Sequence, residues 1–406
     1  MSTVTDPPPA GTTSTDEPES VRSTLTLRLA QLGSLRVAFV LAVIWIVFQS
    51  QNGSFLTSFN LTNLFLQIAG VGTISIGVVL ILLLGEIDLS VGAVSGLAAA
   101  VMAVLNVKHG WSAEASIAAG LATGAVIGLV NGFFVTRFAV PSFVVTLAGL
   151  LAWQGALLQV LGSTGTINLN DPTITGLTGT FYGDAFAWIM VVVIVGAFAI
   201  SGALERVRRA RAGLAPPRLA GFVAQIALIA AGAIAAVLVL TSDRGIPLAG
   251  LILLGLCALF VFITTRTSFG RHVFAVGGNA EAARRSGIHV TRVRLTVFVI
   301  ASTFAAAGGI MLAARLLAVN QGSGGSDLLL LAIAGPVIAG TSLFGGRGSI
   351  WHALLGALVI GSISNGMDLL ALESSVKYMI TGGVLLVAVV IDAVIKTQRE
   401  RAGAAR

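Results

Sequence analysis

The chain has 406 residues, of which 56% are hydrophobic and only 10% are charged. An ordinary soluble domain has about 25% charged residues, so this composition excludes a soluble protein and indicates one surrounded by membrane lipid. The formal net charge of +7 does not point to a nucleic-acid partner, because the basic residues flank long apolar runs, where they set membrane orientation.

The N-terminal stretch differs from the rest of the chain. Residues 1–30 are rich in Pro, Ser, Thr and acidic side chains, so we predict a disordered cytoplasmic segment there. The first apolar run, Leu32 to Phe48, lacks the basic start and nearby small-residue cleavage site of a secretory signal and is interpreted as a retained span. The transmembrane domain is expected over residues 31–396, followed by a basic cytoplasmic tail at 397–406.

Apolar runs long enough to cross a membrane recur along the chain. Crossing about 30 Å of hydrocarbon takes roughly 17–25 apolar helical residues. Twelve candidates follow in chain order: Leu32 to Phe48, Leu64 to Leu84, Leu89 to Leu105, Ala115 to Val135, Phe143 to Leu161, Phe186 to Leu204, Leu219 to Leu240, Leu248 to Thr265, Leu295 to Ala314, Leu328 to Phe344, Ile350 to Leu370 and Tyr378 to Ile395. We therefore predict an all-α, polytopic helical bundle of about 12 (10–12) spans, with room for broken or re-entrant half-helices near Leu89 and Leu328.

Basic residues are distributed unevenly about these spans. An even number of spans places both termini on one side, and all but four of the 24 Lys and Arg residues fall on that side. The four exceptions are Lys108, Arg244, Arg315 and Lys377. Cytoplasmic loops carry the excess of Lys and Arg, so both termini are predicted to lie in the cytoplasm.

Two hydrophilic segments are long enough to do more than turn the chain. Residues 162–184, on the outer side, are rich in Thr, Gly and Asn, which suits contact with a soluble partner or a hydroxylated solute. Residues 266–294, on the inner side, carry the signals of a short helix: Asn279 as its cap, Glu281 in its first turn and Gly287 at its end. A helix this short is marginal unless something packs on it.

Two glycine-bearing interruptions break the apolar pattern. The first, GEIDLSVG from Gly85 to Gly92, places acidic groups in an apolar stretch, where they are costly. Asp88 can cap a half-helix that faces a polar pathway, as at the broken helices of transporters, or it can be a plain cap in a tight cytoplasmic turn between two ordinary spans. Gly340 to Ser349 is the second interruption, and the two together resemble either a degenerate internal repeat or a coincidence in an apolar chain.

No catalytic or nucleotide-binding constellation is visible. The chain has no GxxxxGK[ST] phosphate loop, four His without metal-pair spacing, and one cysteine, Cys257, inside an apolar run. We therefore expect no enzymatic activity, no metal and no bound cofactor. A transporter of this kind conducts passively, uses an ion gradient, or takes its energy from another subunit.

Five segments occur in an order that is typical of one transporter family. They are GEIDLSVG (Gly85 to Gly92), PSFVVTLAG (Pro141 to Gly149), GGNAEAARRSGI (Gly277 to Ile288), GTSLFGG (Gly340 to Gly346) and SNGM (Ser364 to Met367). The chain resembles the xylose- and ribose-type permeases of ATP-binding cassette (ABC) sugar importers, which are inner-membrane components of binding-protein-dependent transport systems. It is most similar to xylose-type members, because it carries an extra pair of spans around the basic stretch Arg206 to Arg218.

The resemblance implies a particular assembly in a bacterial inner membrane. Two permease copies would form the pore, bound to cytoplasmic ATPase subunits that use ATP-Mg and fed by an extracytoplasmic sugar-binding protein. It also implies that residues 279–288 form the coupling helix that docks in a groove of the ATPase. The residues assigned to this helix are Asn279, Glu281, Ala282, Ala283 and Gly287.

Polar residues within the spans are candidates for a sugar pathway, because they can exchange hydrogen bonds with hydroxyl groups. We select Asp88, Asn131, Gln154 and Asn365, together with Trp153, whose ring could stack on a sugar face. For each amide, an interhelical hydrogen bond is an equally good interpretation. For Trp153 the alternative is interfacial packing.

The resemblance thus implies the permease subunit of an ATP-driven importer of xylose or a similar pentose or hexose. The alternative is an ion-coupled secondary transporter, which also has twelve spans and a basic inner loop after the sixth. Such transporters usually carry a basic motif between spans two and three, where this chain has Glu86 and Asp88.

Overall fold

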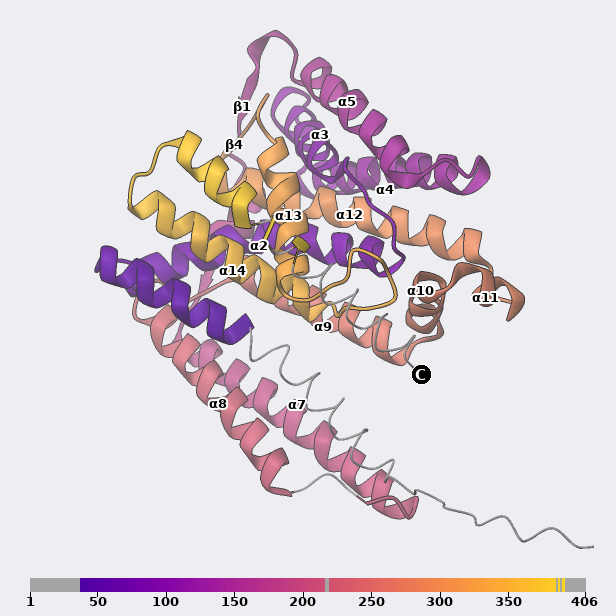
Figure 1. The fold of residues 1–406 in the computed structure, drawn as a ribbon. Coiled ribbons are helices and arrows are strands. Elements are labelled where there is room, and N and C mark those ends of the chain that lie inside the picture. The colour runs from indigo at the N-terminus through magenta and orange to yellow at the C-terminus, as the bar shows by residue number, and fades with distance from the viewer. Residues whose placement is uncertain (1–36, 216–218, 385, 388, 391–406) are drawn as a thin grey trace, which may run out of the picture.

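The fold is a bundle of helices (Figure 1). The computed structural model describes residues 37–215 and 219–390, apart from 385 and 388, so the predicted terminal segments 1–30 and 397–406 lie outside the described residues. The longer helices are α2 (Ser58–Leu83), α4 (Ala113–Arg137), α5 (Ser142–Leu161), α7 (Asp184–Arg211), α8 (Leu219–Thr241), α9 (Leu248–Arg266), α12 (Val290–Leu316) and α14 (Trp351–Leu369). The shorter ones are Val37–Gln51, α3 (Val91–Ala103) with its π-helical extension Val104–Lys108, the 3-10 turn Gly162–Thr164, α6 (Pro172–Gly179), α10 (Ser268–Gly278), α11 (Ala280–Arg285), α13 (Ser326–Ile338) and helical residues from 374 onward.

Each predicted span contains a helix, which confirms the all-α polytopic bundle. Eight of the described helices are long and apolar enough to cross a membrane. α13 is not one of them, since it has 13 residues and rises about 20 Å, short of the roughly 30 Å of hydrocarbon. The last predicted span continues past the described residues, so the exact count of twelve stays a prediction.

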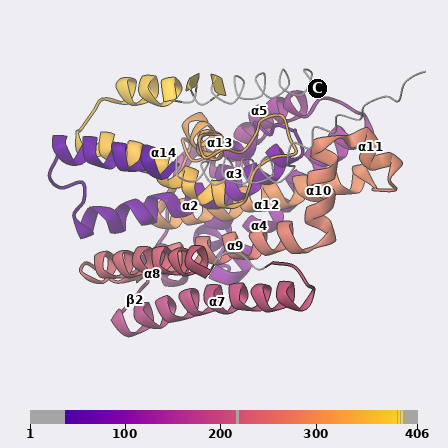
Figure 2. The same ribbon diagram turned by 60° about the horizontal axis from the view of Figure 1, so that its bottom comes forward.

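Helix α2 forms the centre of the bundle. Nineteen of its 26 residues are buried, and α12, α14, α9 and α13 pack around it. A helix that is apolar on every side is stable only in an interior of this kind. Figures 1 and 2 show α2, α12 and α14 lying side by side.

Glycines let the central helices approach one another closely. A Cβ added at Gly309 of α12 would lie 2.2 Å from the Ser95 carbonyl oxygen of α3. One added at Gly124 of α4 would lie 2.5 Å from the Ser302 carbonyl oxygen of α12. Small residues allow the two backbones to touch. This van der Waals packing holds membrane helices together, because the hydrophobic effect does not drive their association in lipid.

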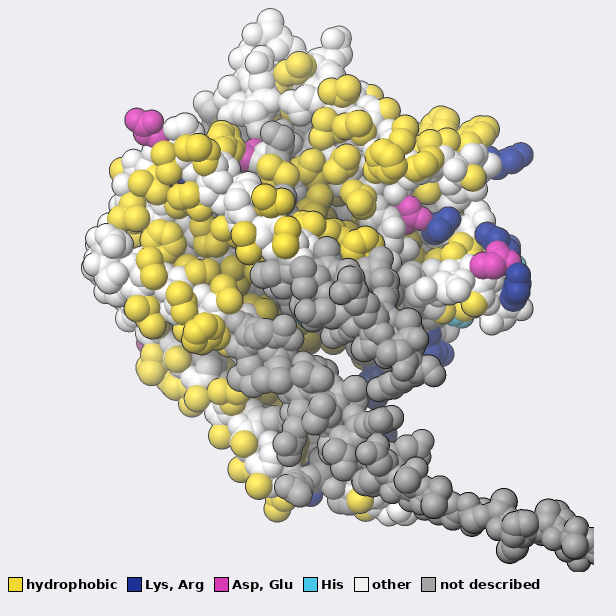
Figure 3. Space-filling view, in the orientation of Figure 1, with side chains coloured by type: hydrophobic (Ala, Val, Ile, Leu, Met, Phe, Trp, Pro, Cys, Tyr) yellow, Lys and Arg dark blue, Asp and Glu magenta, His cyan; other side chains and the backbone are white. Residues whose placement is uncertain are grey.

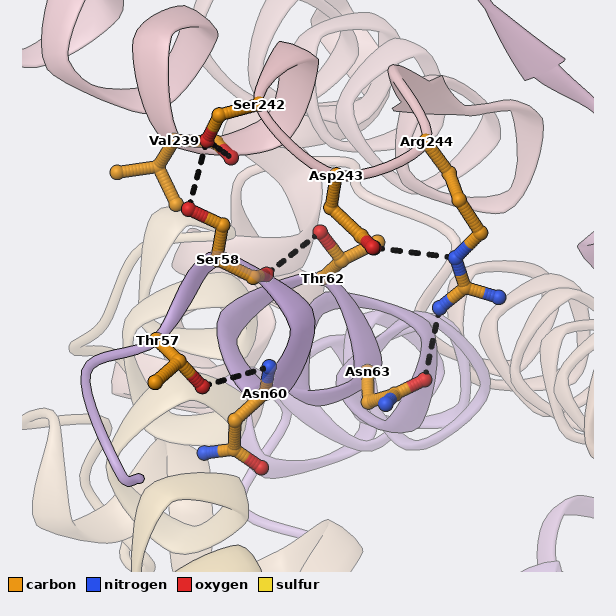
Figure 4. A network of polar contacts seen from close by, with 9 residues as sticks. All are labelled: Thr57, Ser58, Asn60, Thr62, Asn63, Val239, Ser242, Asp243 and Arg244. Carbon is orange, nitrogen blue, oxygen red and sulfur yellow. Dashed lines mark hydrogen bonds and ion pairs between the residues drawn. The ribbon is translucent and has the colours of Figure 1, made fainter. Parts of the chain in front are cut away.

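Helices α7 and α8 form a hairpin at the edge of the bundle (Figure 2). Most of their side chains are exposed, as expected for helices that face lipid. Polar contacts join the end of α8 to the start of α2 (Figure 4). The hydroxyls of Ser58 and Ser242 lie 2.6 Å apart. Arg244 donates to Asn63 Oδ1 at 3.0 Å and pairs with Asp243 at 3.0 Å.

Two short antiparallel strand pairs connect the loops. β1 (Thr166–Asn168) pairs with β4 (Ala318–Asn320), and β2 (Phe181–Tyr182) pairs with β3 (Ile246–Pro247). The hydrophilic segment 162–184 is therefore structured and attached to the ends of α8 and α12. Within it, the Asp171 carboxylate caps α6 by accepting from the Thr173 and Ile174 amides.

Overpacking one of these helix contacts should destabilise the bundle. Gly309→Val places a side chain against the backbone of α3, and overpacking of this kind typically costs about 1–3 kcal/mol. Gly232→Val in α8 is the matched control, because nothing lies within 4 Å of a Cβ added at Gly232. We expect the thermal unfolding midpoint in detergent to fall by several degrees more for Gly309→Val than for Gly232→Val. Equal shifts would contradict the packing described above.

Candidate functional site

Three of the five sequence motifs meet at one point of the fold. The turn after α2 begins at Gly85, the loop after α13 contains Gly345 and Gly346, and Gly277 lies at the end of α10. The Gly346 amide donates to the Leu83 carbonyl oxygen at 2.9 Å. Segments far apart in the sequence are thus joined backbone to backbone, and we call this contact the motif junction.

Glycine is required on every side of the motif junction. A Cβ added at Gly277 would lie 1.7 Å from the Leu83 carbonyl oxygen, which leaves no room for any side chain. Gly85 has φ 74° and Gly345 has φ 85°, a left-handed conformation that glycine adopts at no steric cost. Gly85, Gly277 and Gly345 are therefore explained by the close approach of three backbones.

Asp88 lies beside the motif junction in a buried polar network. Its Oδ1 accepts from the Ser90 amide at 2.8 Å and from the Ser90 hydroxyl at 2.6 Å. Asn131 of α4 donates to the Ser90 hydroxyl oxygen at 3.0 Å. A carboxylate that accepts from the amide two residues on closes an Asx-turn, and the N-cap of α3 is Ser90. Asp88 therefore fixes Ser90, the residue at which α3 begins, through both the amide and the hydroxyl of that residue.

Ser142 and Thr146 of α5 hold the non-helical backbone of this turn, and the sequence analysis missed both. The Ile87 amide donates to Ser142 Oγ at 3.1 Å, and the Leu89 amide donates to Thr146 Oγ1 at 3.1 Å. Non-helical backbone is tolerated at membrane depth only where the protein supplies such partners. The signal was present in PSFVVTLAG, where two hydroxyl residues stand four positions apart and share one helix face.

The structure brings together three of the five predicted pathway residues. A Cβ added at Gly149 would lie 3.0 Å from Trp153 Nε1 and 3.4 Å from Asn131 Oδ1. The indole of Trp153 therefore lies close to Asn131, which belongs to the network of Asp88. Trp153 Nε1 and Asp88 Oδ2 are buried, and no hydrogen-bond partner for them is found among the described residues. These two atoms are unsatisfied polar groups within the network.

The other two predicted pathway residues lie elsewhere. Asn365 of α14 exchanges two hydrogen bonds, at 2.7 and 3.0 Å, with Asn60. Asn60 lies in the first turn of α2, and Asp88 follows the last turn of the same helix. Because α2 has 26 residues, the amide pair and Asp88 lie near opposite ends of it. Asn365 therefore makes the interhelical amide pair that was its alternative interpretation. Gln154 donates to the Gln321 carbonyl oxygen at 3.1 Å in an exposed contact.

The short helix expected near residue 279 is present as α11. Asn279 Oδ1 accepts from the Ala282 amide at 2.9 Å, and Gly287 has φ 84° after the last turn. Glu281 forms exposed ion pairs with Arg284 at 2.8 Å and with Arg285 at 3.2 Å. The helix has six residues, and only Ala283 among them is buried. α11 thus projects from the bundle beside α10 (Figure 1).

An ion pair joins the turn after α2 to the start of α12. Arg294 Nε lies 3.1 Å from Glu86 Oε1, and the two side chains are 30% and 13% exposed. Arg294 belongs to the helix that follows α11 in the chain. The segment that carries α11 is therefore held to the turn of Asp88 both by this ion pair and by Gly277.

Among the described residues, no group of three or more His, Cys, Asp and Glu could hold a metal.

Comparisons with known proteins agree over most of the chain. The family model for the permease component of branched-chain amino acid transport systems matches residues 60–389. The xylose transport system permease protein of Haemophilus influenzae is 38% identical over 353 residues, which cover 87% of this chain and 94% of that protein. The corresponding Escherichia coli protein is 36% identical over 360 residues, covering 89% and 91%. The ribose import permease protein of Bacillus subtilis is 32% identical over 364 residues, covering 90% and 93%. No solved structure matches the chain.

Charge reversal tests the ion pair between Glu86 and Arg294. Glu86→Arg places two cations together at a largely buried site, where loss of a partner costs up to about 3–5 kcal/mol. The control is Glu205→Arg, at an exposed pair with Arg209, where about 0.2–1 kcal/mol is expected. We expect Glu86→Arg to lower the thermal unfolding midpoint more than Glu205→Arg does. The double variant Glu86→Arg/Arg294→Glu should recover part of the loss, and no recovery would argue against a direct pair.

Proposed function

The chain belongs to the family of branched-chain amino acid transport system permease components, and we propose that it carries a monosaccharide, xylose or a similar pentose or hexose, as the membrane-spanning subunit of an ATP-driven importer. The observation behind the choice of solute is that relatives named for xylose and ribose match at least 87% of the chain. Family and relatives favour this function over the ion-coupled alternative. A permease component is a transporter subunit and not an enzyme, as predicted.

Membership in this family implies two kinds of partner: an ATPase subunit and a solute-binding protein. ATP-Mg is then used by the ATPase, and we propose that this chain binds no cofactor of its own. Exposed apolar side chains on α4, α5, α7 and α8 support contact with membrane lipid and, for part of that surface, with a second permease copy. The paired copy forms part of the proposal.

We propose that α11 is the coupling helix that docks on the ATPase. Three features support this role: its exposure, its short length, and its capped, charged first and last turns. A six-residue helix has little stability of its own, so a groove that covers it would complete its packing. The proposed site residues are Asn279, Glu281, Ala282, Ala283 and Gly287.

We propose that the end of the bundle with α10 and α11 faces the cytoplasm, and that both termini lie on that side of a bacterial inner membrane. Lys and Arg side chains gather at this end in Figure 3, whereas the flank of the bundle is apolar. Arg137 and Arg266, at the ends of α4 and α9, also belong to the predicted inner side. An excess of Lys and Arg marks cytoplasmic loops.

Charge reversal on α11 tests the coupling role. Glu281→Arg removes two ion pairs within α11 and reverses the charge presented to the ATPase. In proteoliposomes that hold this chain, its ATPase and its binding protein, we expect sugar-stimulated ATP hydrolysis and sugar uptake to fall about tenfold, as for an interface loss of about 1.4 kcal/mol. Glu205→Arg is the matched control, because Glu205 is equally exposed and pairs with Arg209 four positions on.

Two outcomes would overturn these proposals separately. If Glu281→Arg keeps full stimulated hydrolysis, α11 is not the coupling element. If the chain alone moves sugar down an ion gradient, the ATP-driven importer is wrong and the secondary transporter takes its place.

A further inference from the structure

A cavity of about 230 Å³ lies between α2, α3, α12 and the loop that leads into α13. Its lining combines polar side chains with an apolar wall. The polar members are Gln67, Ser95, Ser323 and Asp327, and the wall includes Leu312 and Leu328. None of the five predicted pathway residues lines it.

The loop that forms one side of the cavity is non-helical and packed on α3. A Cβ added at Gly96 would lie 2.1 Å from the Ser323 carbonyl oxygen, and Gly324 has φ 74°. The loop keeps its shape through Asn320, whose Oδ1 accepts from the Gly322 amide at 2.9 Å. The Asn320 amide in turn donates to Ser323 Oγ at 3.0 Å. In a membrane protein, non-helical backbone among the helices is expected where it is buried or lines a polar cavity.

Two polar side chains that line the cavity, Gln67 and Asp327, offer hydrogen-bonding groups. Gln67 Oε1 is buried, and no hydrogen-bond partner for it is found in the described part of the chain. The same side chain is held in place by its Nε2, which donates to Asp368 Oδ2 at 3.4 Å. Asp327 lies in the first turn of α13 and is exposed. A side chain with an unsatisfied acceptor therefore lines the cavity from one helix, and a carboxylate lines it from another.

We propose that this cavity is a transient binding site for the transported monosaccharide, in which Gln67 Oε1 and the Asp327 carboxylate accept hydrogen bonds from sugar hydroxyls. The volume lies below the roughly 300–1,000 Å³ of pockets for drug-sized ligands, which suits a solute as small as a pentose. Leu312 and Leu328 give the C–H face of the sugar an apolar surface. Two acceptors and a short apolar wall bind weakly, so the solute can leave again. The inference rests on the proposed function and assigns residues to it.

Substitution of the two acceptors tests the site in the complete complex. Gln67→Leu keeps the size of the side chain and removes the acceptor, and Asp327→Asn removes the charge. The matched controls are Gln225→Leu, on the exposed surface of α8, and Glu373→Gln, at an exposed loop. We expect each cavity variant to lower the sugar uptake rate about fivefold, because Gln67→Leu loses a hydrogen bond and Asp327→Asn loses the charge that strengthens one. ATP hydrolysis stimulated by the binding protein should stay within twofold of wild type, and the controls should change neither rate.

A labelling experiment does not depend on the rate of transport. Ser323→Cys places a thiol in the cavity, and the native Cys257 is buried, so the wild type supplies the blank. We expect methyl methanethiosulfonate to label Ser323→Cys more slowly in the presence of the sugar that the wild-type complex imports from a panel of D-xylose, D-ribose and D-glucose. The enantiomer of that sugar at equal concentration should protect much less.

The outcomes separate this inference from the proposed function. If the wild-type complex imports none of the three sugars, the monosaccharide proposal falls and the cavity assignment falls with it. If import proceeds, while Gln67→Leu and Asp327→Asn behave as their controls and the sugar does not protect Ser323→Cys, only the cavity assignment is overturned.

Discussion

Every backbone amide and carbonyl inside a bilayer needs a partner from the protein, since no water reaches it there. The long helices meet this requirement within themselves. Two non-helical segments of the described chain, at residues 85–90 and 340–350, find part of their partners in neighbouring segments. Ser142 accepts from Ile87, and Leu83 accepts from Gly346. These segments therefore lie where other backbones and hydroxyls are close, and the first of them holds the buried Asp88 and Ser90.

This dependence explains what the sequence could predict. Helices were found because apolar runs and charged breaks are local, and α11 was found because its cap and its first-turn acid lie within three positions of each other. A half-helix near Leu328 was allowed for, but the residue at which α13 ends was not predicted. Apolar residues continue past its end to Leu343 and Phe344, so a hydropathy profile sees no boundary there. What ends the helix is the left-handed Gly340 and the contact of its loop with the turn after α2.

Polar residues of the spans were harder to interpret, because their partners are distant in the sequence. Asn60 and Asn365 are 305 positions apart, and nothing near either residue reveals the pair. Asn131 was selected with Asp88 on chemistry alone, and their connection through Ser90 is visible only in three dimensions. Gln67 lies in an apolar run and Ser323 in a glycine-rich loop, where single-sequence reasoning gives neither residue a role. The cavity between them arises from the packing of α3 on that loop.

The hairpin of α7 and α8 shows how such a bundle tolerates additions. α7 packs mainly on α8, and α8 adjoins the rest of the protein at α2 and at the short strand β3. The polar contacts of Ser242 and Arg244 lie only at one end of the hairpin. A pair of helices attached in this way can be gained or lost by a gene without rearranging the central helices. Members of one lineage can therefore differ by two membrane crossings and still share an ancestor, a core and a mechanism.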